Sequence, residues 1–225
     1  MVTWRQHIGI KYELCSQAGI SCQRESEIMV VFKQELRRST STNPARKTNI
    51  NWLVNMQGDS SSYNLLASGP FDYVAQWNPR QQKNFGTAYS RYTNATSNIT
   101  EMTVTGEFQV VQGMPYFVSA MTEKDIYWTG KMPKHVTFEL KYVPGTFSEN
   151  YIVLPLDTQI KTAKDLCNKL ITKGIMNGSS TITRWDALQQ LPVILPKCQL
   201  NPNISLEPGV PYLIRVTNSG NWVQE

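Results

Sequence analysis

The side chains in this sequence with the greatest capacity for chemistry are its four cysteines. An even number of cysteines fits disulfide bonding in an oxidising, extracellular setting. A structural zinc site needs four nitrogen or sulfur ligands at short spacing, but no C-x-x-C is present and the chain has only two histidines. We therefore expect disulfides and no metal. The cysteines are Cys15, Cys22, Cys167 and Cys198.

The short patterns that commonly mark an active site do not occur. There is no H-E-x-x-H, no G-x-S-x-G, no Walker A motif and no G-x-G-x-x-G after a strand. Thr129-Gly130-Lys131 lacks the upstream glycine loop that would hold a phosphate. We expect no catalysis and no cofactor. A hydrolase with an unrecognised site is an alternative, because a Ser-His-Asp arrangement or a carboxylate pair can form in space without a local pattern.

The six tryptophans are the best candidates for ligand binding, since exposed aromatic rings often contact sugars. Two of them, Trp77 and Trp185, occupy matched places in two similar segments, as packing of a repeated domain requires. We prefer the packing role, and a carbohydrate-binding module with an aromatic platform is the alternative. Further candidate contacts lie in the polar segment Asn84–Thr100, which looks like a surface loop: Tyr89, Arg91 and Tyr92.

The elements that must position these residues are predicted twice. Phe108–Trp128 and Ile204–Val223 each contain an apolar run, a Gly turn, a Pro-Tyr pair, a second apolar run and a Trp. The Gly-x-Pro-Tyr turn of the first copy matches that of the second at an offset of 96 (209 minus 113). This pattern is typical of a strand, a turn, a second strand and a hairpin.

Earlier segments are also paired. The strands Ile28–Leu36 and Val136–Val143 open the two copies, with Phe32 matched to Phe138. In the next strands, Trp52 matches Ile152 at an offset of 100 (152 minus 52). Helical spacing follows in both copies, and each helix is succeeded by a strand that ends at Trp77 or Trp185. The helical segments are Ser60–Ser68 and Thr162–Thr172, the second with Thr162 as N-cap and Asp165 close to a capping box.

The sequence therefore predicts a mainly β fold with two tandem antiparallel β domains, sandwich or barrel-like, each with one short helix. The domains are 28–130 and 134–225. Residues 1–27 form an N-terminal extension, either the tail of a preceding repeat or a lone edge strand. The connection is too short for a flexible linker, so we expect the domains to pack together. Cys167 and Cys198 lack counterparts in the first copy, so we pair them with each other and Cys15 with Cys22.

Composition limits the partners. The net charge is +5 and the pI about 9.0, but the basic residues are scattered, so we expect no nucleic-acid binding. No run of eighteen apolar residues occurs, so we expect no membrane insertion. Cysteines and N-x-S/T triplets favour an extracellular or cell-surface location, with this chain a mature part or fragment of a longer protein. The triplets begin at Asn94, Asn98, Asn177 and Asn203.

The second copy contains, in order, an L-P strand, TAKDLC, ITRWDA and SLEPGVPYLI. This order resembles a β-rich tandem repeat of large secreted and cell-surface proteins of bacteria and archaea. The match covers 134–225 well and 28–130 more loosely, since Gln112 replaces the turn proline. The resemblance implies location and architecture, and the family's own function is undefined. We expect a non-catalytic structural or adhesive module whose partners are a glycan, another surface protein or neighbouring repeats of a longer chain.

Overall fold

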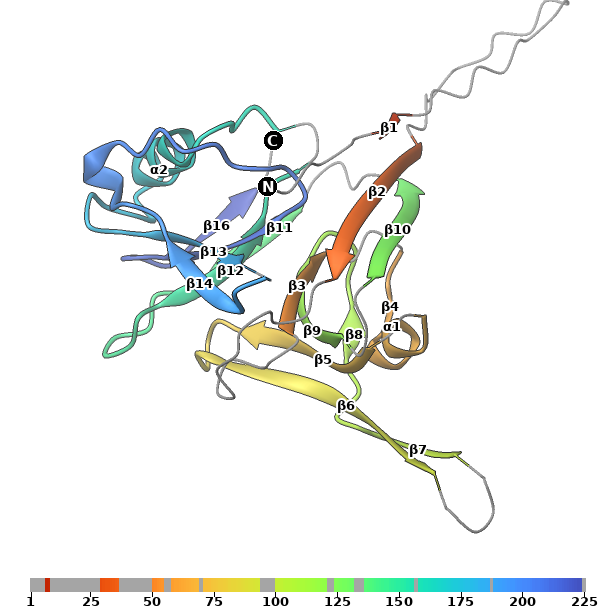
Figure 1. Cartoon of the computed structure of the whole chain (residues 1–225). Coiled ribbons are helices and arrows are strands. Elements are labelled where there is room, and N and C mark those ends of the chain that lie inside the picture. The colour runs from red at the N-terminus through yellow and green to blue at the C-terminus, as the bar shows by residue number, and fades with distance from the viewer. Residues whose placement is uncertain are drawn as a thin grey trace, which may run out of the picture.

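The computed structural model of the chain describes residues 7–8, 29–36, 50–54, 58–68, 71–93, 100–120, 124–131, 136–155, 158–186 and 188–223. The fold is mainly β with antiparallel sheets and two helices, as the sequence predicts (Figure 1). The larger sheets are open, and every strand pair among the described residues is antiparallel. Residues 15 and 22 lie outside the described part, so the Cys15–Cys22 bond stays a prediction.

The largest sheet belongs to residues 28–130, which we call the first half. Its strand order is β3-β9-β5-β6-β7. Strands β6 and β7 extend away from the body as a long hairpin (Figure 1). The bounds are β3 Ile50–Val54, β9 Pro115–Ala120, β5 Phe71–Asn78, β6 Lys83–Thr93 and β7 Thr100–Thr105.

The sheet of residues 134–225, the second half, has the order β12-β15-β13-β14. The order matches the first four strands of the other sheet: β12 corresponds to β3, β15 to β9, β13 to β5 and β14 to β6. No strand pairs with the outer edge of β14 among the described residues, whereas β6 is covered by β7. The bounds are β12 Glu149–Val153, β15 Pro211–Arg215, β13 Ile182–Asp186 and β14 Leu191–Ile194.

Smaller sheets also correspond. In the first half β2 pairs with β10, and there Phe32 lies opposite Trp128. In the second half β11 pairs with β16, and Phe138 lies opposite Trp222. The short β1 adds to β2, and β4 pairs with β8. The bounds are β1 His7–Ile8, β2 Met29–Leu36, β4 Ser60–Ser61, β8 Gln109–Val110, β10 Lys124–Lys131, β11 Thr137–Leu140 and β16 Gly220–Val223.

One predicted correspondence is wrong by a residue. Val54 lies opposite Pro115 in the first half, and Val153 lies opposite Pro211 in the second. The offset of these strands is therefore 99 (153 minus 54), so the counterpart of Trp52 is Tyr151 and not Ile152. Because successive strand residues point to opposite faces, this shift of one moves each side chain to the other side of the sheet. Ile152 is accordingly fully buried in the core, whereas Trp52 and Tyr151 are partly exposed.

The helices follow the predicted local signals. α1 spans Ser62–Ser68, and α2 spans Ala163–Thr172. Thr162 caps α2, and Asp165 completes a full capping box, since its carboxylate accepts the Thr162 backbone N–H at 2.9 Å. The hydrogen bond from the Thr162 hydroxyl also holds the pKa of Asp165 below its usual range. Asp therefore does here what Glu does in the common form of this motif.

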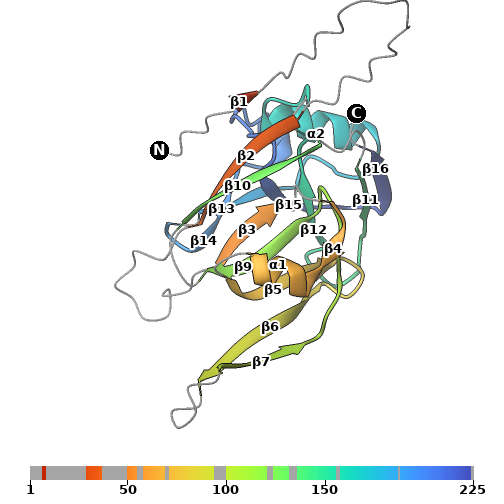
Figure 2. The same cartoon turned by 90° about the vertical axis from the view of Figure 1, so that its right-hand side faces the viewer.

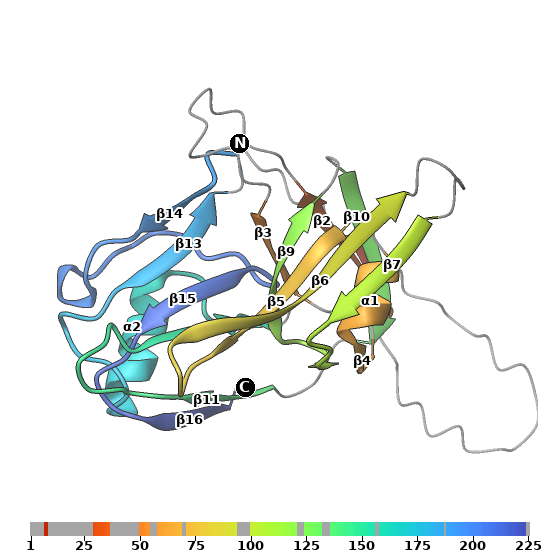
Figure 3. The ribbon, with the colours of Figure 1, turned by 90° about the horizontal axis from the view of Figure 1, so that it is seen from below.

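The two helices lie on opposite sides of the molecule, with the strands of the two larger sheets between them (Figures 1 and 3). In the second half, the buried side of α2 presents Leu166 and Leu170 to the core that also contains Ile182 and Ile214. The two larger sheets lie next to each other, where β12 contacts β9 and β15 contacts β3 (Figure 2). The buried apolar side chains of both halves belong to one cluster, which includes Leu66 and Val74 of the first half and Leu166 and Ile214 of the second. The division of the chain into the domains 28–130 and 134–225 stays a prediction.

Candidate functional site: the junction between the two halves

Aromatic rings from both halves meet at the junction. Tyr151 of the second half lies edge-on to Trp52 at 4.9 Å, to Phe117 at 4.8 Å and to Trp77 at 5.6 Å between ring centroids. Trp185 is stacked on Trp52 at 5.7 Å with an interplanar angle of 19°. Such pairs contribute about 0.5–1.5 kcal/mol each beyond the area they bury. The predicted contact between the two halves is present.

The contacts are reciprocal. Trp52 and Tyr151 are counterparts at an offset of 99 and touch each other. Trp77 and Trp185 are counterparts at an offset of 108 (185 minus 77); Trp52 contacts Trp185, and Tyr151 contacts Trp77. The strand contacts show the same relation: β12 contacts β9, and their counterparts β3 and β15 also contact each other. A surface that meets its own counterpart in this way is the arrangement of a twofold homodimer. The junction therefore has an approximate twofold relation within one chain.

A side-chain amide closes one sheet edge across the junction. Glu149 donates its backbone N–H to Gln82 Oε1 at 2.6 Å, and its carbonyl oxygen accepts from Gln82 Nε2 at 3.1 Å. The indole N–H of Trp77 donates to the same carbonyl at 2.7 Å. The Gln82 amide thus supplies the donor and the acceptor that a neighbouring strand would supply to β12. This matters because β12 lies at the edge of its sheet, where backbone groups otherwise lack partners.

The turn that carries Gln82 is built the same way in both halves. Asn78 Oδ1 accepts the backbone N–H groups of Arg80 and Gln81, and Asp186 Oδ1 accepts those of Leu188 and Gln189. Asn and Asp side chains commonly stabilise turns in this way. The turns end at positive φ, 51° at Gln82 and 54° at Gln190. From this position the Gln82 side chain reaches the Glu149 backbone across the junction.

Charged groups surround the aromatic rings. Arg80 bonds Glu139 at 2.9 Å across the junction, and Lys141 also pairs with Glu139. The Lys141 ammonium, and then the Arg80 guanidinium, hold the pKa of Glu139 below its usual range. Because these groups are exposed, such ion pairs contribute little to stability. Within the second half, Arg215 pairs with Glu149 at 3.0 Å.

The junction keeps its one tyrosine neutral. Burial, and to a lesser degree the Glu149 carboxylate, raises the pKa of Tyr151 well above its usual value. A phenol with this environment acts as a packing group and not as a general base at ordinary pH. The arrangement can hold two sheets in fixed relation, and its chemistry is that of packing and hydrogen bonding.

Two equivalent tyrosines, Tyr116 and Tyr212, stabilise the turns that precede β9 and β15. The hydroxyl of Tyr116 accepts the backbone N–H of Val111 at 2.7 Å, and that of Tyr212 accepts the backbone N–H of Glu207 at 2.6 Å. Burial raises the pKa of both phenols to about 12. The positive φ of Gly113 and Gly209, 79° and 72°, makes these turns possible, because glycine adopts that region at little cost.

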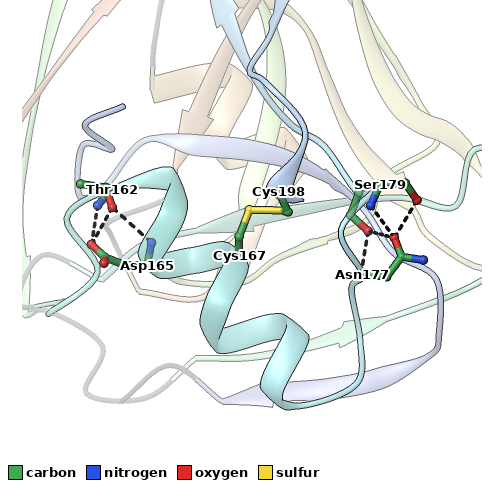
Figure 4. The surroundings of a disulfide bond; sticks show 7 residues. Thr162, Asp165, Cys167, Asn177, Ser179 and Cys198 are labelled. Atoms are coloured by element: carbon green, nitrogen blue, oxygen red, sulfur yellow. Dashed lines mark hydrogen bonds between the residues drawn. A yellow bond between two sulfur atoms is a disulfide. The ribbon is translucent and has the colours of Figure 1, made fainter. Parts of the chain in front are cut away.

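The predicted disulfide between Cys167 and Cys198 is confirmed (Figure 4). It joins α2 to the short 3-10 helix η2, Cys198–Leu200, with 5.6 Å between the Cα atoms. The link lies on the side of α2 that packs on the core, since both cysteines are buried. It therefore fixes the strap of residues 197–204 against the helix.

The structure distributes the predicted contact residues unevenly. Trp77 and Trp185 both lie at the junction, and their rings contact Tyr151 and Trp52 respectively. The other three predicted contact residues, Tyr89, Arg91 and Tyr92, lie in the part of β6 that pairs with β7. Their partners across that pair are Val104, Met102 and Glu101. Part of Asn84–Thr100 lies outside the described residues. The part that is described is strand and not loop up to Thr93.

Comparisons with protein-family models, with curated proteins and with solved structures find no match. The resemblance to a repeat of surface proteins therefore stays a prediction. Among the described residues, no group of three His, Cys, Asp or Glu side chains is placed to hold a metal ion. In the same part of the chain, no helix combines the length and apolar character needed to cross a membrane.

Sequence reasoning missed several residues of the junction: Trp52, Gln82, Phe117, Glu149 and Tyr151. A signal existed for two of them. Gln82 recurs as Gln190, and Trp52 recurs as an aromatic residue once the offset of 99 is used. Glu149 had no signal, because it acts through its backbone.

Proposed function

We propose that this chain is a non-catalytic structural or adhesive module of a secreted or cell-surface protein, in which the two halves form one rigid unit. The observation that carries the proposal is the junction. Its recurring aromatic residues contact one another across the two halves, and Gln82 binds the Glu149 backbone across the same boundary. A module that transmits force or presents a partner site at a fixed place benefits from such rigidity.

The disulfide supports an extracellular setting. A bond between Cys167 and Cys198 forms and persists where the environment is oxidising. In the chain-entropy view it constrains a long stretch of the unfolded chain, since 31 residues separate the cysteines. A surface protein outside the reach of chaperones gains from this constraint.

The alternative of an aromatic sugar platform has less support. Trp77 already donates its indole N–H to Glu149, and Trp185 lies against Trp52. A sugar-binding platform needs rings whose flat faces are open to solvent. The same contacts support the packing role for these two tryptophans.

Backbone ¹⁵N relaxation on the whole chain tests the rigid unit. We expect one rotational correlation time for amides of both halves. The variant Trp52→Ala should give two shorter times, because Trp52 contacts both Tyr151 and Trp185. Tyr63→Ala is the matched control, since Tyr63 is an exposed aromatic residue on α1. Independent tumbling of the halves in the unaltered protein would refute the proposal.

A further inference from the structure

The outer surface of α2 and the adjoining strap carries an unbalanced positive charge. The segments 158–180 and 195–207 hold five lysines and two carboxylates, Asp165 and Glu207. Four of the five side chains are exposed and Lys169 is half-buried. We call this group the α2 lysine surface; its members are Lys161, Lys164, Lys169, Lys173 and Lys197.

The fold brings these lysines together from two separate stretches of sequence. The Cys167–Cys198 bond places Lys197 beside the middle of the helix. From there the strap runs toward the start of α2, where Lys164 N–H donates to the Pro202 carbonyl at 2.9 Å. Lys164 and Lys173 are nine residues apart, about 14 Å along a helix axis. The charge therefore extends along the whole helix.

Two acids offset part of this charge, and an excess of three positive charges remains (five lysines minus two carboxylates). Lys164 is one of the groups that hold the pKa of Asp165 below its usual range. The Asp165 carboxylate is occupied by the capping box, where it accepts from Thr162 and from the Lys161 backbone. Burial raises the pKa of Glu207, and the charge of Arg184 opposes this. Lys161 donates its ammonium to the Thr158 carbonyl at 2.6 Å, so its own contact is with a neutral group.

The fold itself does not require these lysines. The equivalent helix of the first half, α1, has the sequence SYNLLAS and contains no charged residue. Both helices lie on the outer side of equivalent sheets (Figure 3). Lysines near the end of a helix also stabilise its dipole, but that role concerns only the last turn. Lys161, Lys164 and Lys197 lie away from it.

The chemistry of the surface selects among anionic partners. The two segments contain no Phe, Tyr or Trp, so bases of a nucleic acid would find no ring to stack on. They contain no Arg, which is the usual residue for bidentate phosphate recognition. Lysine ammonium groups are hydrated point charges that suit the spaced carboxylates of a flexible, hydrated chain.

We propose that the α2 lysine surface binds a linear anionic polysaccharide. The choice of polysaccharide rests on the proposed extracellular function, whereas the charge complementarity does not. Binding is electrostatic and follows the length of α2. The first half takes no part in it.

The experiment uses the whole chain with its disulfide intact. Polygalacturonate is the probe, dextran is the neutral polymer, and calorimetry measures affinity at low and at moderate salt. We expect binding to polygalacturonate only, with an affinity that falls about tenfold or more over a fourfold rise in salt. Lys164→Glu combined with Lys173→Glu should weaken binding by about tenfold or more.

The matched control is Lys83→Glu combined with Lys124→Glu, which changes the net charge equally but lies in the first half. It should leave affinity within about twofold, because charges farther than a Debye length are screened. Circular dichroism melting confirms that both double variants fold. Equal loss in the two variants, or no loss in either, overturns the proposal.

Two further arms test the identity of the partner. An oligothymidylate and vesicles of phosphatidylcholine with phosphatidylglycerol replace the polysaccharide in the same assay. Stronger binding to either one overturns the choice of polysaccharide. The relaxation experiment is independent of this result. Separate tumbling of the halves with intact polymer binding would refute the rigid module alone. A single correlation time for both halves with no polymer binding would refute this inference alone.

Discussion

Replacing Gln82 with alanine should loosen the junction without disturbing the hydrophobic core, because Gln82 is not among the buried residues of that core. The amide of Gln82 makes three hydrogen bonds: two with the Glu149 backbone, and one from Nε2 to the Pro79 carbonyl at 2.6 Å. Alanine removes all three and leaves the Glu149 N–H without its acceptor. The positive φ of 51° is kept by both residues, so backbone strain changes little.

The expected size follows from these bonds. A hydrogen bond contributes about 0.5–1.5 kcal/mol net, so three give about 1.5–4.5 kcal/mol. Gln82 is partly exposed, and water replaces part of what is lost, so the lower half of this range applies. We expect a loss of about 2 kcal/mol. For a chain of this size, that corresponds to about 4–8 °C in Tm.

Urea unfolding monitored by tryptophan fluorescence measures this loss, because three of the junction residues are tryptophans. Gln81→Ala is the matched control: its backbone N–H bonds the Asn78 side chain, and its own side chain is exposed. The control should change stability by less than about 0.5 kcal/mol. Equal effects of the two substitutions would show that Gln82 does not hold the halves together.

Three other changes test separate features. Tyr212→Phe should cost about 1–2 kcal/mol in thermal unfolding, because the hydroxyl bonds the Glu207 backbone at 2.6 Å; an unchanged Tm would contradict this. Glu207→Gln should stabilise the protein at neutral pH and have little effect below about pH 4, because burial raises the pKa of Glu207 above its unfolded value and ionisation is therefore unfavourable in the fold. Stability measured from pH 3 to 8 checks this, and a benefit confined to low pH would reverse the sign. Reducing Cys167–Cys198 should lower stability by about 3–4 kcal/mol, measured by denaturation with and without reductant, and no loss would contradict the chain-entropy argument.

Local signals in the sequence predicted local structure well. The N-cap at Thr162 and the glycine turn at Gly209 follow from chemistry within a few residues. The antiparallel fold followed from apolar runs of period two. These features were predictable because their causes lie close together in the chain.

The junction could not be predicted in the same way. Gln82 and Glu149 are 67 residues apart, and their contact uses backbone groups that carry no residue identity. Trp52 was misaligned by one residue because hydrophobicity alone does not fix the register of a short strand next to a proline. The tryptophans were recognised as repeated, but their partners depend on how two sheets meet. Only the structure supplies that relation.

The approximate twofold relation of the junction has a consequence for longer chains. An interface in which each half offers its partner the same face is closed, as in a twofold dimer, and leaves no free copy of that face. Head-to-tail repeats, by contrast, can be added one at a time without limit. If units like these halves recur along a polypeptide, this interface joins them in couples. The number of such units per chain should then be even, and one pair of units should contact the next pair through a different surface.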